Sequence, residues 1–344
     1  MKHILFCFGT RPEIIKMAPV ILEANERGLK TTICLTGQHK EMILPFLEFF
    51  HISEDYCLEV MKSHQSLAQL NASILSQMDD IITKLDLDFI AVQGDTTSTF
   101  ACAFAGFLKK IPILHIEAGL RTNDIYSPFP EEVNRQMVST FAHYNFCPTE
   151  NSKKNLEREN RKNIFVTGNT SIDALRITSN KIEESNLDQK FKVKYSHINF
   201  DKKIILVTAH RRENHGEPLQ DIFKALKVIA ATHDCEIVYP VHLNPNILET
   251  AKRELNNIKN IHLLSPLEYL DFTWFMKKSF IILTDSGGVQ EEAPYFKKPI
   301  LILRENTERP EVVEAKAAIL VGSNKDLIIS EFKKCFEDQA YYQS

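Results

Sequence analysis

The sequence lacks the features that mark several classes of protein. Its 41 lysines and arginines are outnumbered by 45 aspartates and glutamates, so the basic excess typical of nucleic-acid binders is missing. No apolar run approaches the roughly 18 residues of a membrane-spanning segment. The apolar run after Met1 is too short for a signal peptide and is expected to form a first strand. The sequence therefore predicts no nucleic-acid partner and no membrane partner.

Cysteine and metal motifs are missing as well. The seven cysteines are odd in number and no two stand in a CxxC spacing, which indicates reduced thiols in a cytosolic protein. No HExxH or EF-hand pattern occurs, and no GxGxxG follows the first expected strand. Asp86-Leu87-Asp88 resembles the DxD metal motif of some glycosyltransferases, but it precedes its strand and is expected to be a solvated turn. The sequence thus predicts neither a metal nor a cofactor.

What the chain does contain is a regular alternation of short apolar runs with longer helical patterns. Such alternation is typical of parallel sheets built from βαβ units, and unbroken apolar runs indicate helices on both faces. The pattern restarts at about Lys203, so we predict an α/β protein with two doubly wound domains, residues 1–170 and 171–344. The expected strands are 3–8, 31–35, 89–93, 112–116, 145–147, 163–166, 203–208, 235–239, 261–263, 280–283 and 299–303.

Nearly every unusual polar cluster directly follows an expected strand. Ligands of open α/β sheets bind outside the carboxyl ends of the strands, so these clusters are expected to line a cleft between the two domains. The clusters are Gly9-Thr10-Arg11, Gly37-Gln38-His39, Gly94-Asp95, Glu117-Ala118-Gly119, His210-Arg211-Arg212, His242-Leu243-Asn244 and Asp285-Ser286-Gly287-Gly288.

The basic and glycine-containing clusters suit a phosphorylated ligand. Ser286-Gly287-Gly288 opens a helix whose free N–H groups could hold a phosphate, although a plain strand-to-helix turn would look the same. Arg11 and Lys16 could face a diphosphate or could be a solvated helix start. His210, followed by two arginines, suits stabilisation of a leaving group, with a surface charge cluster as the alternative.

Three carboxylates suit acid–base chemistry. Asp95 could equally cap a helix, and Glu131 could form a surface ion pair with Arg135 four residues later. Glu117 lies directly after an expected buried strand, a position at which a purely structural role does not readily explain a carboxylate. Carboxylates gathered with arginine and histidine in one cleft would have their pKa values pushed apart, as acid–base work at neutral pH requires.

Taken together, these segments resemble the non-hydrolysing UDP-N-acetylglucosamine 2-epimerases, with ordered matches from residue 9 to about 314. Further matching segments are Gln93-Gly94-Asp95-Thr96, His115 to Thr122, Tyr126 to Glu132 with Asn134-Arg135, Thr167 to Thr170, His210 to Asn214, His242 to Pro245, Asp285 to Pro294 and Thr307 to Glu311. The resemblance implies two Rossmann-like domains facing a central cleft, as in GT-B glycosyltransferases, with the catalytic acids on the first domain and UDP held mainly by the second.

The resemblance also implies residue roles. The implied catalytic residues are Asp95, Glu117, Glu131, Arg135 and His210. The implied substrate-binding residues are Arg11, Lys16, His242, Leu267, Phe272, Ser286, Gly287, Gly288, Glu292 and Arg309, of which Leu267 and Phe272 match positions that hold uracil. The implied reaction is reversible C2 epimerisation of UDP-N-acetylglucosamine through elimination of UDP and its re-addition to a bound 2-acetamidoglucal. A cytoplasmic homodimer and a role in polysaccharide biosynthesis are implied as well.

Two departures from the family pattern stand out. Family members often have a regulatory second substrate site, which here maps to Gln38, His39, Glu41 and His64. Glu41 and His64 replace an expected Gln and Arg, which argues against activation by substrate. The sequence also ends before the glycine-rich segment and final helix that relatives carry, and domain closure is expected to be weaker without that helix.

Several alternative functions remain open at this point. A hydrolysing epimerase would release N-acetylmannosamine and UDP; the intact Arg11-Pro12-Glu13 segment favours the non-hydrolysing branch. A diacetamido uronic acid sugar is a further alternative, although Ser127-Pro128-Phe129-Pro130 favours N-acetylglucosamine. A glycosyltransferase of the same fold would need an acceptor site, and a sensor without catalysis would not need the three acids.

Overall fold

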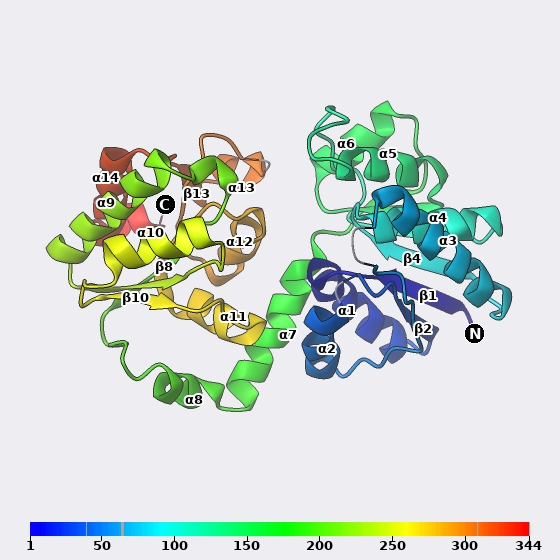
Figure 1. The fold of residues 1–344 in the computed structure, drawn as a ribbon, viewed down its shortest axis with the longest axis horizontal. Helices are drawn as coiled ribbons and strands as arrows, with labels where there is room; N and C mark the ends of the chain where they lie inside the picture. The colour runs from blue at the N-terminus through cyan, green and yellow to red at the C-terminus, as the bar shows by residue number, and fades with distance from the viewer. Residues whose placement is uncertain (39, 63–64, 308, 344) are drawn as a thin grey trace. The chain divides into compact units, whose positions relative to one another are not determined.

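The computed structural model describes residues 1–38, 40–62, 65–307 and 309–343 (Figure 1). The chain divides into two compact units, Met1–Ala174 and Leu175–Ser344. The boundary falls inside helix α7 (Thr170–Glu184), whereas the sequence prediction put it at the first residue of that helix. Each unit is built around one parallel sheet, and each is described here by itself.

The first unit contains a seven-stranded sheet in the order β3-β2-β1-β4-β5-β6-β7, and its six strand pairings are parallel. The order reverses between the neighbours β1 and β4, which makes their carboxyl ends the topological switch point of this sheet. The strands are β1 (His3–Phe8), β2 (Lys30–Leu35), β3 (Tyr56–Cys57), β4 (Phe89–Gln93), β5 (Ile113–Ile116), β6 (Tyr144–Cys147) and β7 (Ile164–Val166).

Helices cover both faces of the first sheet. Figure 1 shows α3 and α4 on one side and α1 and α2 on the other, and apolar residues of α3, α4 and α5 form one core with β1, β4 and β5. The helices before α7 are α1 (Arg11–Glu26), α2 (Lys40–Phe50), α3 (Leu67–Thr83), α4 (Thr97–Leu108), α5 (Glu131–Phe141) and α6 (Glu150–Arg158). Burial from both sides explains why the strands read as unbroken apolar runs.

The second unit repeats this architecture with a six-stranded parallel sheet in the order β10-β9-β8-β11-β12-β13. Its switch point lies between the neighbours β8 and β11. The strands are β8 (Lys203–Thr208), β9 (Cys235–Pro240), β10 (Ile261–Leu264), β11 (Ser279–Thr284), β12 (Ile300–Ile302) and β13 (Ala318–Leu320).

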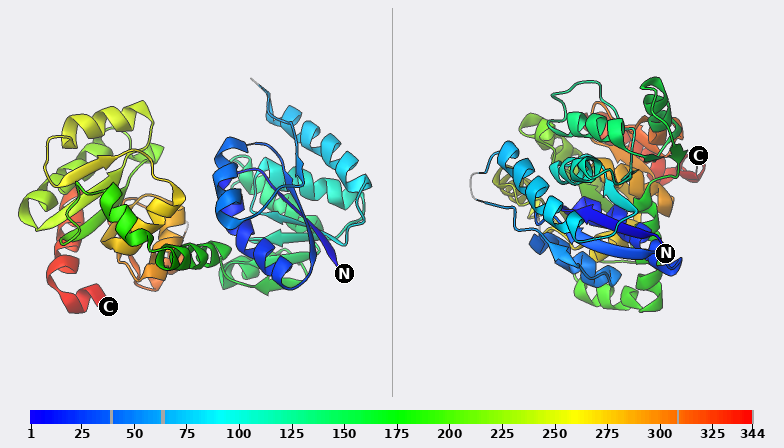
Figure 2. Two further views of the ribbon diagram at one scale, coloured as in Figure 1. Left: turned by 90° about the horizontal axis from the view of Figure 1, so that it is seen from below. Right: turned by 90° about the vertical axis from the view of Figure 1, so that its right-hand side faces the viewer.

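The second sheet is also covered on both faces. Helices α9, α10 and α14 form one apolar core with it, and Figure 1 shows α11 on the opposite side; Figure 2 gives two further views of the same layers. The remaining elements are α8 (Leu187–Lys194), η1 (Arg212–Asn214), α9 (Glu217–Thr232), α10 (Pro245–Leu255), α11 (Tyr269–Lys278), α12 (Gly287–Glu292), η2 (Ala293–Phe296), α13 (Pro310–Glu314), α14 (Lys325–Glu337) and α15 (Gln339–Gln343).

The predicted α/β fold with two doubly wound sheets is confirmed. Every expected strand is present, with ends that differ from the prediction by at most one residue. The short edge strands β3 and β13 were not predicted, because two or three residues carry too little periodicity to stand out. Within the described part of the chain, no helix is long and apolar enough to cross a membrane. All seven cysteines are free, and six are buried.

A buried carboxylate fixes the turn between β1 and α1. Glu13 is 1% exposed and accepts hydrogen bonds from the backbone N–H groups of Gly9 (2.9 Å) and Thr10 (2.7 Å). It also accepts from the hydroxyl groups of Thr96 (2.7 Å) and Thr99 (3.0 Å), which belong to the start of α4. Burial raises the pKa of Glu13, and these hydrogen bonds oppose that shift. One side chain therefore ties together the two loops at the first switch point.

Replacing Glu13 should destabilise the first unit. Glu13→Ala leaves the backbone N–H groups of Gly9 and Thr10 without their acceptor, and we expect the free energy of unfolding to fall by about 2–4 kcal/mol. The measurement is urea denaturation, combined with hydrogen exchange of the peptide that covers residues 9–13. Glu23→Ala, on the same helix but exposed, is the matched control. Equal stability of the two variants would contradict a structural role for Glu13.

Candidate active site

The polar residues singled out in the first unit gather at the carboxyl edge of its sheet. Arg11 and Lys16 lie on α1 after β1, Asp95 follows β4, and Glu117 follows β5. Glu131 is the first residue of α5. Parallel strands bring their carboxyl ends to one edge, so residues far apart in the sequence become neighbours there.

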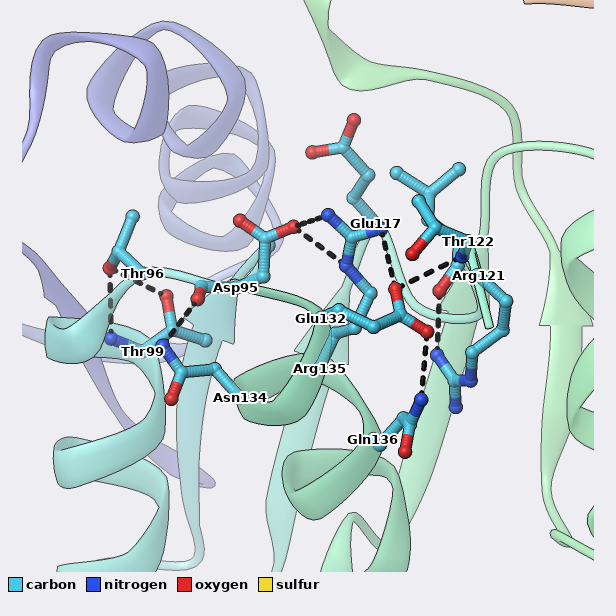
Figure 3. Close-up of polar contacts among 12 residues, drawn as sticks. Asp95, Thr96, Thr99, Glu117, Arg121, Thr122, Glu132, Asn134, Arg135 and Gln136 are labelled. Atoms are coloured by element: carbon cyan, nitrogen blue, oxygen red, sulfur yellow. Dashed lines mark hydrogen bonds and ion pairs between the residues drawn. The ribbon is translucent and has the colours of Figure 1, made fainter. Parts of the chain in front are cut away.

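Asp95 and Arg135 form the central ion pair of this edge (Figure 3). The guanidinium of Arg135 donates to Oδ2 of Asp95 through Nε (2.9 Å) and Nη2 (2.5 Å). Its Nη1 atom donates to Glu132 at 3.2 Å, and the Glu132 side chain is completely buried. Asn134 donates from its side-chain amide to the backbone carbonyl of Asp95 at 2.9 Å. The first turns of α5 therefore hold Asp95 from two sides.

The Asp95 carboxyl group has a perturbed proton affinity. Burial raises its pKa, the guanidinium of Arg135 lowers it, and the nearby negative charge of Glu131 raises it again. The net effect is a raised pKa. A carboxyl group with a raised pKa beside a second carboxylate is a common arrangement in sites that transfer protons.

Glu117 is held in a second ion pair. Its Oε1 atom lies 2.5 Å from Nζ of Lys16, and the amide of Gln93 donates to its Oε2 atom. The side chain of Glu117 is only 9% exposed. Its backbone adopts φ 60°, a left-handed conformation that residues other than glycine rarely take. Strain of this kind concentrates at functional sites, where the surrounding structure maintains it.

The neighbouring Gly119 shows why the chain can make this turn. It has φ 91°, and a Cβ atom there would lie 2.3 Å from the backbone oxygen of Ser152. A larger residue would push the loop away from α6, where Leu156 packs against Ala118. The loop that carries Glu117 can therefore pack closely against α6 because residue 119 is a glycine.

Three further predicted residues of the first unit, Arg11, Gln38 and Glu41, have described positions. Arg11 lies over the ring of Phe46, with 5.2 Å from Cζ to the ring centroid. Gln38 accepts a hydrogen bond from the hydroxyl of Ser98 at 3.1 Å, and Glu41 is exposed in the first turn of α2. Two residues of the predicted regulatory set, His39 and His64, lie outside the described residues.

In the second unit, Asp285 organises the switch point. It is completely buried directly after β11, and its Oδ2 atom accepts from the backbone N–H groups of His210 and Arg211, both at 2.8 Å. The side chain of Asn214 donates to the same oxygen at 2.9 Å and to the carbonyl of Leu303 at 3.0 Å. Although burial acts to raise the pKa of Asp285, the hydrogen bonds and charge of His210 outweigh it and the net shift is downward.

His210 is presented by this arrangement. Its Nδ1 atom lies 3.2 Å from Oδ1 of Asp285, and its ring is stacked on the ring of His242 with centroids 5.8 Å apart. His242 follows β9 and accepts a hydrogen bond from the N–H of Asn244 at 3.1 Å. The structure therefore brings these two predicted residues together.

The turn after Asp285 leads directly into α12. Ser286 is its N-cap, Gly287 and Gly288 are its first two residues, and Glu292 is its last. Arg309 reaches Glu291 on the same helix through its Nε atom. The loop that carries Arg309 is held by Thr307, whose hydroxyl donates to the buried Gln290 at 2.5 Å. Leu267 and Phe272 lie at the start of α11, and both are half-buried.

Three residues that organise the site were not among the predicted site residues. Gln93 donates a hydrogen bond to Glu117, and Glu132 accepts one from Arg135. Asp285 accepts a hydrogen bond from the backbone N–H of His210. Gln93 and Asp285 stand next to predicted residues, directly at the ends of strands. Glu132 stands beside Glu131 in the matching segment Tyr126 to Glu132, but its bonds to the N–H groups of Thr122 (3.0 Å) and Asn123 (3.2 Å) depend on the path of a long loop.

The side chains with described positions offer acid–base groups and cations but no cluster of metal ligands. Among the residues with described positions, no group of three or more His, Cys, Asp and Glu side chains could hold a metal ion. His115 is fully buried, and burial lowers its pKa to about 4. Its Nε2 atom bonds to the carbonyl of Gly94 at 2.7 Å, so it supports the loop before Asp95.

Comparisons with known proteins agree on one family. The family model described as UDP-N-acetylglucosamine 2-epimerase matches residues 22–344. The UDP-N-acetylglucosamine 2-epimerase of Neisseria meningitidis serogroup A is 45% identical over 99% of this chain and 92% of its own length. The enzyme of Escherichia coli K12 with the same name is 46% identical over the same shares of both chains.

Solved structures give the same result. The crystal structure of the N. meningitidis UDP-GlcNAc 2-epimerase bound to UDP-GlcNAc has a TM-score of 0.89 and covers 99% of this chain and 93% of that one. The Methanocaldococcus jannaschii enzyme in complex with UDP-GlcNAc and UDP is 34% identical, covers 98% of this chain and 94% of its own, and has a TM-score of 0.78. With this agreement over nearly its whole length, the chain belongs to the UDP-N-acetylglucosamine 2-epimerase family.

Proposed function

We propose that this protein is a non-hydrolysing UDP-N-acetylglucosamine 2-epimerase, which interconverts UDP-N-acetylglucosamine and UDP-N-acetylmannosamine. The observation that carries the proposal is the pairing of two carboxylates with cations, Asp95 with Arg135 and Glu117 with Lys16, at the carboxyl edge of one sheet. Two relatives with this family name have been solved with UDP-GlcNAc bound, which supports the choice of substrate. In this proposal the first unit acts on the sugar and the second binds UDP.

The chemistry follows from the substrate. The C2 proton of the sugar is not acidic, because no carbonyl group is adjacent to C2. Departure of UDP breaks the bond from C1 to the diphosphate oxygen, which takes the electron pair. Loss of the C2 proton to a carboxylate then forms the double bond of a 2-acetamidoglucal. A proton delivered to the opposite face of C2 and re-addition of UDP at C1 complete the epimerisation.

The side chains supply what these steps need. Asp95, Glu117 and Glu131 are the proposed acids and bases, with Arg135 and His210 supporting them. Arg11, Lys16 and the N–H groups at the Ser286-Gly287-Gly288 turn would stabilise the departing diphosphate, because fixed donors lower the cost of developing negative charge. Leu267 and Phe272 would contact uracil, and His242, Glu292 and Arg309 would complete the nucleotide site.

We also propose a cytoplasmic homodimer that serves polysaccharide biosynthesis. The seven free thiols favour a reducing compartment. Large apolar side chains on α4 and α5 are exposed, with Phe107 at 48%, Leu108 at 61% and Met137 at 41%. Adjacent exposed apolar side chains are typical of surfaces that another chain covers, which supports self-association.

The decisive measurement is proton NMR of UDP-N-acetylglucosamine incubated with the protein in D2O. We expect deuterium at C2 and a stable mixture of UDP-linked gluco and manno sugars, because re-addition of UDP regenerates the nucleotide sugar. Free N-acetylmannosamine with stoichiometric UDP would instead identify a hydrolysing epimerase. Absence of both exchange and product would contradict epimerisation of this substrate.

Removing the Asp95 carboxylate should separate catalysis from nucleotide binding. We expect Asp95→Asn to reduce turnover about 10²–10⁴-fold, the usual contribution of a positioned acid or base. The affinity for UDP, measured by calorimetry, should stay unchanged because UDP is proposed to bind the second unit. Asp80→Asn, an exposed position on α3, is the matched control. Full activity of Asp95→Asn would rule out a catalytic role for this carboxylate.

The two charged neighbours should move the pKa of Asp95 in opposite directions. Glu131→Gln removes a negative charge and should lower that pKa, so Asp95 ionises at lower pH. Arg135→Gln removes the cation that favours ionisation and should raise it, so Asp95 stays protonated to higher pH. The measurement is a ¹³C NMR titration of labelled aspartate carboxyl groups, with the exposed Glu150→Gln as control. Shifts of the same sign would refute this account of the site.

A further inference from the structure

A basic cavity lies in the second unit, away from every residue assigned above. Its volume is about 350 Å³ and its lining contains five lysines, Lys192, Lys202, Lys203, Lys278 and Lys298, against the single carboxylate of Asp201. Cavities of this size bind small molecules rather than extended surfaces. The whole chain carries a net charge of −4, so this concentration of positive charge is local.

Three of the five ammonium groups have carboxylate partners outside the lining. Asp188 lies 3.1 Å from Lys192 and 2.7 Å from Lys278, so one carboxylate holds two ammonium groups close together. Lys202 pairs with Asp234 at 2.9 Å and lies 3.7 Å from Glu236, so its charge is compensated. Asp188 offsets only one of the two ammonium charges that it holds.

The other two lysines have no carboxylate partner among the described residues. Lys203 donates to the carbonyl of Phe336 at 3.1 Å, and its Nζ atom lies 4.1 Å from the ring centroid of Phe280. Lys298 is half-buried at the start of the turn into β12. Burial lowers its pKa, and the nearby charge of Lys278 lowers it further. A protonated Lys298 here lacks the anion that would offset its desolvation.

The cavity is separate from the nucleotide side of the same unit. Lys203 is the first residue of β8 and Lys278 immediately precedes β11, whereas His210 and Asp285 follow the opposite ends of these strands. Five residue steps along a parallel strand correspond to about 16 Å. A ligand in the cavity would therefore not compete directly with a nucleotide bound near Ser286.

We propose that this cavity is a binding site for a small phosphate-bearing anion, distinct from the site for the nucleotide sugar. Lysine ammonium groups bind phosphate oxygens as point charges, and several lysines lining one cavity supply positive charge that would offset the negative charge of a diphosphate or phosphomonoester. The concave shape selects a small molecule rather than the backbone of a nucleic acid. The ligand contains a phosphate group and is either an inorganic phosphate or a sugar phosphate.

The test is calorimetric titration of the full chain with inorganic pyrophosphate and, separately, with glucose 6-phosphate. Saturating UDP is present throughout, so that its own site is occupied. We expect one anion per chain, and binding at least tenfold weaker in Lys298→Gln and in Lys203→Gln, since each loses a charged contact worth about a factor of ten or more. The ligand that binds more tightly shows whether the site takes an inorganic phosphate or a sugar phosphate.

The exposed Lys190→Gln on α8 is the matched control and should bind like the unmodified chain. Thermal denaturation without anion distinguishes lost binding from misfolding, because Lys298→Gln removes an uncompensated charge and should not lower the melting temperature. Lack of binding of either anion to the unmodified chain would overturn the proposal. Equal binding by all three variants would overturn it too, and neither result would bear on epimerisation.

Discussion

Parallel pairing of β1 with β4 in the first unit, and of β8 with β11 in the second, is the constraint on which the candidate site residues of each unit depend. It brings the carboxyl ends of neighbouring strands to one edge at the point where the strand order reverses. Short loops then suffice to bring Thr96 to the Glu13 carboxylate in the first unit and His210 to Asp285 in the second. The chemistry of the site is a consequence of that topology.

Buried carboxylates convert this general arrangement into a specific geometry. Glu13, Glu132 and Asp285 are each at most 1% exposed, and each accepts hydrogen bonds from backbone N–H groups of loops at the carboxyl edge. Loops at such edges have few apolar contacts to hold them, so these acceptors take over that role. The functional groups keep fixed positions because fully buried acids hold the backbone of the neighbouring loops.

The fold was predictable because its signal is local. The strands are continuous apolar runs, and candidate residues such as Asp95 and Glu117 stand within two residues of the end of one. The partners of these residues were harder to predict from the sequence, because the hydrogen bond from Lys16 to Glu117 spans 101 positions and that from Arg135 to Asp95 spans 40. Spacing along the chain carries no information on such contacts. The loop anchored by Glu132 was hidden for the same reason, and the edge strands β3 and β13 were too short to detect.

Pairing each acid with its own cation has a consequence for the charge of the site during turnover. When Glu117 takes up a proton, its negative charge disappears while the ammonium of Lys16, 2.5 Å away, keeps its positive charge. Protonation of Asp95 likewise takes away one of the two carboxylate partners of the Arg135 guanidinium, while Glu132 stays paired with it. Each proton gained by one of these carboxylates thus leaves the positive charge at the sheet edge less compensated. A leaving group that gains negative charge in the same step would find its counter-charge already in place, and the net charge of protein and ligand would stay constant.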